Sequence, residues 1–122
     1  MSNTMSSASP GQIRIQVHTD AIPLQQLVSL KSECENLAEK LVGALAVRFE
    51  DGEDEGKYLN IIFGTWACED LWPQIDAALY QSVAHGPTLR AQSMALCTGN
   101  DGWNDYVLLY HFDPGVPVEQ AQ

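Results

Sequence analysis

The chain has 122 residues, of which 45% are hydrophobic, and its 16 acidic and 6 basic side chains give a formal net charge of −10. This length predicts one domain, and the apolar content is typical of a folded protein rather than a disordered one. The acidic excess disfavours nucleic acid and anionic membranes as partners, because both attract Lys and Arg. It favours a basic protein partner, although negative charge also serves simply to keep a small protein soluble.

We expect three segments along the chain. Residues 1–11 are serine-rich and lack the positive end and apolar core of a secretory signal, so they predict a disordered leader. Residues 12–113 predict a single α+β domain, and residues 114–122 a polar tail. No apolar run reaches the roughly 20 residues of a membrane-spanning helix, so we expect a cytoplasmic protein.

A strand and a long helix open the predicted domain. Apolar Ile13, Ile15 and Val17 alternate with polar residues, which is the period of a half-buried strand. An amphipathic helix is predicted next, ending before Gly43. Its apolar stripe repeats at spacings of three and four and comprises Leu24, Leu27, Val28, Cys34, Leu37, Ala38, Leu41 and Val42.

A hairpin follows the helix. Leu45, Val47 and Phe49 alternate with polar residues and predict a second strand. Residues 51–56 are predicted as a charged turn, because they combine acidic side chains with two glycines. Residues 58–65 predict a third strand that is apolar on both faces and therefore central in the sheet.

The last third of the domain predicts a helix and a second hairpin. The helix begins near Cys68, with an apolar face at Leu71, Trp72, Ile75, Ala78, Leu79 and Val83, and Gly86-Pro87 is expected to end it. Residues 89–98 predict a fourth strand, residues 100–102 a turn, and residues 106–112 a fifth strand. The resulting order, β-α-β-β-α-β-β, predicts a ferredoxin-like sandwich with two helices on one face of an antiparallel sheet.

The sequence carries no recognisable catalytic, cofactor or metal motif, and we assign no residue to such roles. The cysteines, Cys34, Cys68 and Cys97, form no C-x-x-C pair, so we expect buried thiols. The acidic turn matches an EF-hand loop at positions one, three, five and six, but Ile62 stands at position twelve, where a bidentate Glu is required.

Aromatic and acidic residues near turns are the candidates for partner binding. Trp66 and Trp103 flank predicted helices and strands, and exposed aromatic side chains often anchor protein partners. Acidic side chains lie beside Trp103 or in the charged turn, where they would attract a basic partner: Asp101, Asp105, Asp51, Glu53, Asp54 and Glu55.

The stretch Asp101-Gly102-Trp103-Asn104-Asp105-Tyr106 enters the final predicted strand. This D-G-W-x-x-Y pattern, on a small acidic chain with this element order, resembles the protein regulators that inhibit ribonuclease E. The resemblance implies a non-catalytic protein that binds and restrains an enzyme. The acidic residues of this chain, however, lie in a turn in mid-chain rather than in an acidic tail, and the chain has a fifth predicted strand.

Three functions stay open at this point. The first is a regulator or inhibitor of another protein, including the immunity proteins that neutralise toxins. The second is a small cofactor-independent enzyme of the dimeric α+β barrel type, in which two copies of the chain close around a pocket. Its candidate pocket residues are His18, His111, Tyr110 and Trp66. The third is an acidic secretion chaperone.

Overall fold

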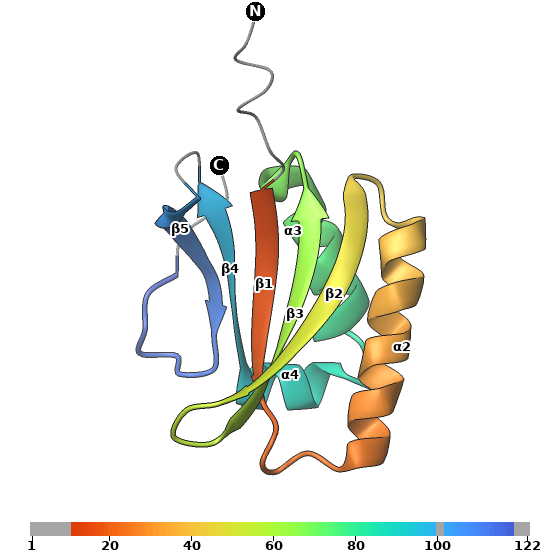
Figure 1. The fold of residues 1–122 in the computed structure, drawn as a ribbon, viewed down its shortest axis with the longest axis vertical. Coiled ribbons are helices and arrows are strands. Elements are labelled where there is room, and N and C mark those ends of the chain that lie inside the picture. Colours follow the sequence, from red (N-terminus) through yellow and green to blue (C-terminus); the bar gives the residue numbers. More distant parts are fainter. Residues whose placement is uncertain (1–10, 100–101, 119–122) are drawn as a thin grey trace, which may run out of the picture.

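A single five-stranded antiparallel sheet organises the protein (Figure 1). The computed structural model describes the backbone of residues 11–99 and 102–118 and the side chains of residues 11–98 and 106–118. The strands lie in the order β2-β3-β1-β4-β5. Their bounds are β1 Gly11–His18, β2 Ala44–Glu53, β3 Lys57–Thr65, β4 Ser93–Gly99 and β5 Gly102–His111. The predicted leader, except for Gly11, and residues 119–122 of the predicted tail lie outside the described residues.

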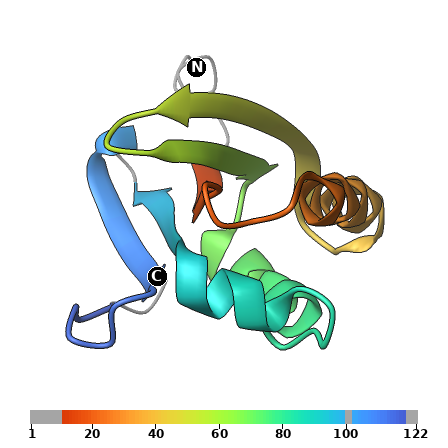
Figure 2. The same cartoon turned by 90° about the horizontal axis from the view of Figure 1, so that it is seen from below.

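The helices leave one face of the sheet without a helix. α3, Cys68–Ile75, continues as a π-helical segment, η1, over Asp76–Tyr80, and α4 spans Gly86–Gln92. These elements lie behind the sheet in Figure 1, while α2, Leu24–Lys40, runs along its β2 side (Figures 1 and 2). We call the opposite surface the open face, because no helix of the described residues covers it. None of these helices is long and apolar enough to span a bilayer.

The predicted order β-α-β-β-α-β-β, with its two-helix ferredoxin-like sandwich, is wrong. The described residues form three α-helices, in the order β-α-β-β-α-α-β-β, and a π-helical segment continues the second of them. The error lies at Gly86-Pro87, which we expected to end a helix and which instead begins α4. Proline has no N–H to lose in a first turn, so it starts a helix as readily as it stops one. Leu89 is therefore a buried helical residue, and β4 begins at Ser93.

β1 forms the centre of the core. It pairs with β3 on one edge and with β4 on the other, both antiparallel. Ile13, Ile15 and Val17 are completely buried on the helix side, as their alternation predicts. β3 lies between β1 and β2, which confirms its predicted central position. Its Leu59, Ile61 and Phe63 complete the same layer of buried side chains.

Only part of the predicted apolar stripe of α2 faces the core. Of the predicted residues, Cys34 and Leu37 are buried, and Leu27, Ala38 and Leu41 pack beside them; Leu30, which the predicted stripe left out, is buried as well. Leu24 and Val28, which share the predicted stripe, are exposed. The buried positions recur at spacings of three and four and share one face of the helix, whereas Leu24 and Val28 project from the flank of that face.

A bulge in β2 redirects one predicted core residue. The pairing of β2 with β3 shifts register between Ala44 and Val47. Because side chains alternate between faces, an extra residue on one strand turns the side chains before it to the opposite face. Val47 and Phe49 pack against the core, whereas Leu45 is exposed, 48% of its surface being accessible.

The charged turn is shorter than predicted. β2 continues to Glu53, which pairs with Lys57, so only residues 54–56 make the turn. Glu55 and Gly56 adopt positive φ angles of 57° and 134°. The turn end of the hairpin is attached to the β1–α2 connection. The Lys57 N–H donates to Asp20 Oδ2 at 3.1 Å, and Lys57 O accepts from the Thr19 N–H at 3.0 Å.

The packing of α2 predicts unequal costs for two leucine truncations. Leu30 has 2% of its surface exposed and Leu24 has 76%. Leu30→Ala should lower the free energy of unfolding by about 2–5 kcal/mol through lost burial and a cavity. Leu24→Ala should change it by less than about 0.5 kcal/mol. Urea unfolding of both variants checks this, and equal losses would contradict the observed orientation of α2.

Candidate functional site

Trp66 is held in an exposed position by the turn that follows β3. Its side chain is 63% exposed, whereas the preceding Thr65 is buried. Thr65 Oγ1 accepts a hydrogen bond from the Ala67 N–H at 3.1 Å, which closes the turn before α3 begins at Cys68. The backbone around the indole is therefore defined, and the ring itself faces solvent.

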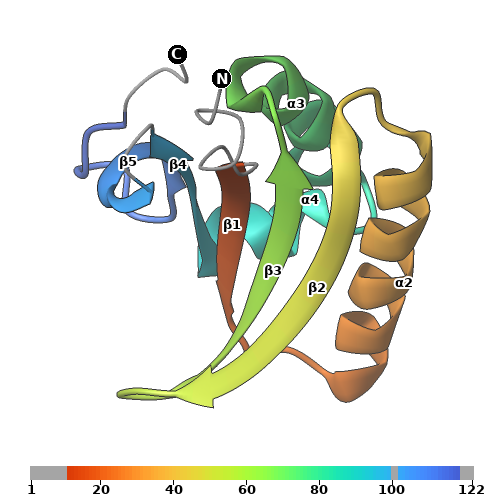
Figure 3. The same cartoon turned by 45° about the horizontal axis from the view of Figure 1, so that its top comes forward.

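Two other exposed apolar side chains belong to the same end of the sheet as Trp66. They belong to the α2–β2 connection, which is adjacent to the β3–α3 connection at one end of the sheet (Figure 3). Ala44 pairs with Thr65, so the residues that flank these two positions are neighbours across the strands. Val42 is 79% exposed and Leu45 is 48% exposed, and Leu45 lies over Gly64. We call Val42, Leu45 and Trp66 the end patch.

The end patch is braced from beneath by α3. The Val42 N–H donates to Gln74 Oε1 at 3.2 Å, and Gln74 Nε2 donates to the Val42 carbonyl at 2.7 Å. Gln74 Nε2 also donates to the Asp70 carbonyl at 3.1 Å. One side chain of α3 thus fixes the backbone at Val42, which limits the conformational entropy that this connection would lose on binding.

Charged residues flank the patch on both sides. Glu69 and Asp70 are exposed in the first turn of α3, where the helix dipole favours acidic side chains. Lys40, in the last turn of α2, contributes a base on the other side. These charges form a polar rim around an apolar centre, which is the usual composition of a protein interface.

The predicted acidic candidates are not gathered with Trp66. Asp51, Glu53, Asp54 and Glu55 are all exposed, but they lie at the end of β2 and in the turn before β3, whereas Trp66 follows the end of β3. A strand of nine residues separates the two positions by roughly 25–30 Å. The predicted site therefore divides into two surfaces at opposite ends of the sheet.

The remaining predicted candidates come from the β4–β5 connection. β3 and β4 both run antiparallel to β1, so this connection leaves the sheet at the same end as Trp66. Asp101 lies outside the described residues. The backbone of Trp103 and Asp105 belongs to β5, but their side chains also lie outside the described part of the chain.

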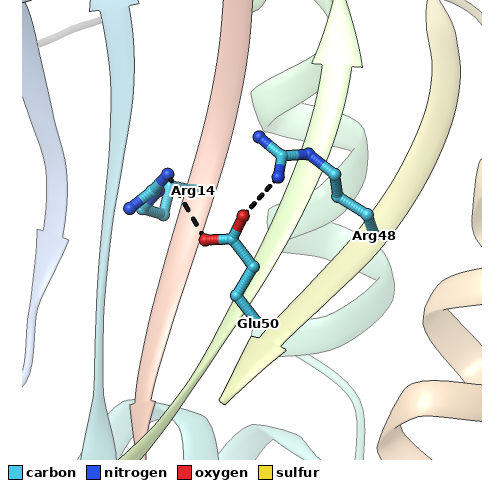
Figure 4. A network of polar contacts seen from close by, with 3 residues as sticks. All are labelled: Arg14, Arg48 and Glu50. Carbon is cyan, nitrogen blue, oxygen red and sulfur yellow. Dashed lines mark hydrogen bonds and ion pairs between the residues drawn. The ribbon is translucent and has the colours of Figure 1, made fainter. Parts of the chain in front are cut away.

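The open face carries an ion cluster that the sequence analysis missed (Figure 4). Glu50 lies between two arginines, with Arg14 Nη2 at 3.9 Å from Glu50 Oε1, and Arg48 donates a hydrogen bond to its other carboxylate oxygen. The pattern Arg48-x-Glu50 places both side chains on one face of a strand, and this spacing was the available signal. All three side chains are partly exposed, so the cluster contributes little to stability.

The candidate pocket residues of the enzyme hypothesis are divided between surfaces. Phe112 touches both His18 and His111, with ring centroids 5.3 and 4.4 Å apart. Tyr110 points toward the helices instead, where its hydroxyl donates to the Arg90 carbonyl at 2.5 Å. Trp66 belongs to the end patch. The structure therefore brings the two histidines together around Phe112 but not the other two residues.

Burial makes several nucleophile candidates weak acids. It raises the pKa of Cys34 to about 12, with smaller contributions from Glu33 and Glu35. Burial also raises the pKa values of Tyr80 and Tyr110. These groups stay protonated at neutral pH, so none provides a ready thiolate or phenolate. Among the described side chains, no group of three or more His, Cys, Asp or Glu residues lies close enough to hold a metal ion.

Comparison with known proteins yields no relative. No family model, no curated protein and no solved structure matches the chain. The resemblance to inhibitors of ribonuclease E therefore stays a prediction from the stretch 101–106, and the function is argued below from the geometry of this chain.

The raised pKa of Cys34 predicts that the protein loses stability at alkaline pH. Above the ordinary thiol pKa of 9.0 the unfolded chain releases this proton, while the native thiol keeps it up to about pH 12. The native state then binds more protons, so the free energy of unfolding falls by up to about 1.4 kcal/mol per pH unit for this one group.

Urea unfolding of the wild type and of Cys34→Ala, on both sides of pH 9.0, separates this group from the others. Cys34→Ala should be less stable at neutral pH because it leaves a small cavity, but its stability should fall less steeply as the pH rises. Equal slopes for the two proteins would contradict the assignment.

Proposed function

We propose that this protein is a non-catalytic binding protein that regulates or inhibits another protein, and that the end patch holds the partner. The observation that carries this proposal is the grouping of Val42, Leu45 and Trp66, all exposed, on two braced connections. Single exposed apolar residues are ordinary, but an adjacent group built around tryptophan is characteristic of a binding surface. An immunity protein that neutralises a toxin belongs to the same class.

Preorganisation supports binding at this end of the molecule. Gln74 fixes Val42, and Thr65 fixes the turn around Trp66, before any partner arrives. A rigid aromatic side chain loses little conformational entropy when it enters a pocket of a partner. The patch therefore has the properties of an anchor rather than of a flexible recognition segment.

The charge of the chain supports a basic protein as the partner. The net charge is −10, and acidic residues border the end patch at Glu69 and Asp70. Opposite charge speeds the encounter of two proteins, whereas nucleic acid and anionic membranes would be repelled. We place the protein in the cytoplasm in this proposal, because its three cysteines are thiols rather than disulfides.

The enzyme hypothesis receives less support from the geometry. Of its four candidate pocket residues, only His18 and His111 share a neighbour, Phe112. The tyrosine among them has a raised pKa and bonds to the backbone carbonyl of Arg90. We give no preference to a secretion chaperone, since no described surface favours one.

The anchor role of Trp66 predicts a selective effect on complex lifetime. The partner is first captured from native cells on immobilised wild-type protein and identified by mass spectrometry. Trp66→Ala should then raise the dissociation rate of the purified complex at least about tenfold, because central aromatic residues contribute most of the binding energy. Surface plasmon resonance measures this rate.

Val83→Ala is the matched control for Trp66→Ala. Val83 is 96% exposed, but it lies in the connection after η1, away from the end patch. This variant should release the partner at the wild-type rate. A dissociation rate that Trp66→Ala leaves unchanged, or that Val83→Ala raises equally, would remove the end patch from the interface.

Two sets of acidic substitutions test which acidic residues speed the association with the partner. Glu69→Ser with Asp70→Ser removes charge beside the end patch, and serine at Asp51, Glu53, Asp54 and Glu55 removes it at the far end. The Debye length is about 8 Å at physiological ionic strength, so charge near the interface should dominate the encounter. We expect the first set to slow association and weaken its salt dependence.

The second set should change the association rate less at physiological ionic strength, although more charges are removed. Stopped-flow association measurements at several salt concentrations provide the comparison. A larger effect of the second set would show that the partner docks at the acidic turn, in contradiction to the end patch.

A further inference from the structure

We propose that Cys68 and Cys97 form an intramolecular disulfide by exchange with a low-molecular-weight disulfide. This modification site lies directly behind the connection that carries Trp66. The inference goes beyond the proposed function, and its test involves no partner protein.

Both cysteines lie beside the same short stretch of β1, at Gln12 and Ile13. Cys97 in β4 is the register partner of Ile13 and is buried on the helix side of the sheet. Cys68, the first residue of α3, packs against this layer, and its thiol contacts the Gln12 carbonyl at 3.7 Å. Gln12 directly precedes Ile13, so β1 brings together two cysteines that lie far apart in the sequence.

The two thiols are already in contact. The side chain of Cys68 is hydrogen-bonded with that of Cys97. This bond is the main cause of the raised pKa of Cys68, and burial is the second. A disulfide requires Cβ atoms about 3.5–4.5 Å apart and a sulfur–sulfur bond of about 2.05 Å. The hydrogen bond makes the two side chains direct neighbours, so we infer that rotation about their Cα–Cβ bonds brings the sulfurs into bonding distance. Cys34 belongs to α2 and is buried on the face of that helix that packs on the sheet.

The difference in exposure sets the order of the reaction. Cys68 is only half-buried, so its thiolate attacks the small disulfide first, and one small thiol leaves. The buried Cys97, after losing its proton, then attacks the Cys68 sulfur of the mixed disulfide and displaces the second small thiol. The two cysteines lose two electrons, the small disulfide gains them, and the two protons end on the released small thiols. The raised pKa of Cys68 makes its thiolate scarce at neutral pH, so the first step is slow there and becomes faster as the pH rises.

The bond would tie the start of α3 to β4. Trp66 is two residues before Cys68, so oxidation would restrict the backbone that presents the indole. The bridge would close a loop of about 30 residues, for which the loss of entropy in the unfolded chain is substantial. We therefore infer that the end patch is more rigid in the oxidised protein than in the reduced one.

Peptide mapping after oxidation tests the pairing. The full chain is incubated at mildly alkaline pH with oxidised glutathione, alkylated to block remaining thiols, and digested with trypsin. Cys34, Cys68 and Cys97 fall in separate peptides, residues 32–40, 58–90 and 91–122. We expect residues 58–90 and 91–122 to be joined, with the mass of two hydrogens lost, and Cys34 to be alkylated.

Single substitutions provide the controls. Cys34→Ser should form the same bridge as the wild type. Cys97→Ser should instead keep glutathione on Cys68, since it lacks the thiol that displaces it. A wild-type chain that also keeps glutathione on Cys68, or a bridge that includes Cys34, would overturn the proposal.

A chain that does not react in the folded state is examined by a second route. The reduced chain is unfolded in urea and refolded in the same glutathione mixture, so that access to Cys97 no longer limits the reaction. Formation of the bridge between residues 58–90 and 91–122 on refolding supports the pairing. Its absence after both routes would overturn it.

Discussion

The structure depends on the double pairing of β1. β1 pairs with β3 on one edge and with β4 on the other. It therefore joins the β2–β3 hairpin to the β4–β5 hairpin, which comes later in the chain. Ile13, Ile15 and Val17 are fully buried between them and the helices. Because β1 is hydrogen-bonded along both edges, a shift of its register would displace its buried side chains relative to both β3 and β4. The positions of all other elements follow from this strand.

The helices cover only one side of the sheet that β1 organises. The uncovered face contains the cluster of Arg14, Arg48 and Glu50, in which the one carboxylate is paired with both guanidinium groups (Figure 4). The end of the sheet, in contrast, carries apolar side chains that no other part of the described chain covers. Gln74 of α3 fixes the α2–β2 connection, and Thr65 Oγ1 closes the turn at Trp66. This distinction, between a surface whose charged groups pair with one another and one that is apolar and braced, is the physical basis for placing a partner at the end patch.

The end patch and the thiol pair are linked through the same short segment. Thr65 closes the turn, Trp66 leaves it toward solvent, and Cys68 leaves it toward the core. This short segment thus connects the end patch, where we propose that the partner binds, to the buried contact between α3 and β4. A change in the covalent state of the buried side would act on the exposed side over two residues. No long pathway through the fold is required.

Local patterns predicted the individual elements better than their assembly. The alternation in 13–17 and the helical spacing in 24–42 correspond to β1 and α2, although α2 ends at Lys40, because burial on one face leaves a regular period in the sequence. The same reasoning failed at Gly86-Pro87, because a Gly-Pro pair is found both after the end of a helix and in the first turn of one. It also missed the bulge in β2, which exposes Leu45, because a bulge is defined by the partner strand and not by the bulged one.

The candidate site shows the same division. Sequence by itself determined the acidic charge, the types of residue available for binding and the presence of Trp66 after a central strand. Only the tertiary structure decided that Trp66 lies with Val42 and Leu45, that the acidic turn lies at the opposite end, and that Cys68 meets Cys97. Periodicity records which face of an element avoids water. Proximity between elements distant in sequence depends on strand order and register, which arise only when all the apolar faces are buried together.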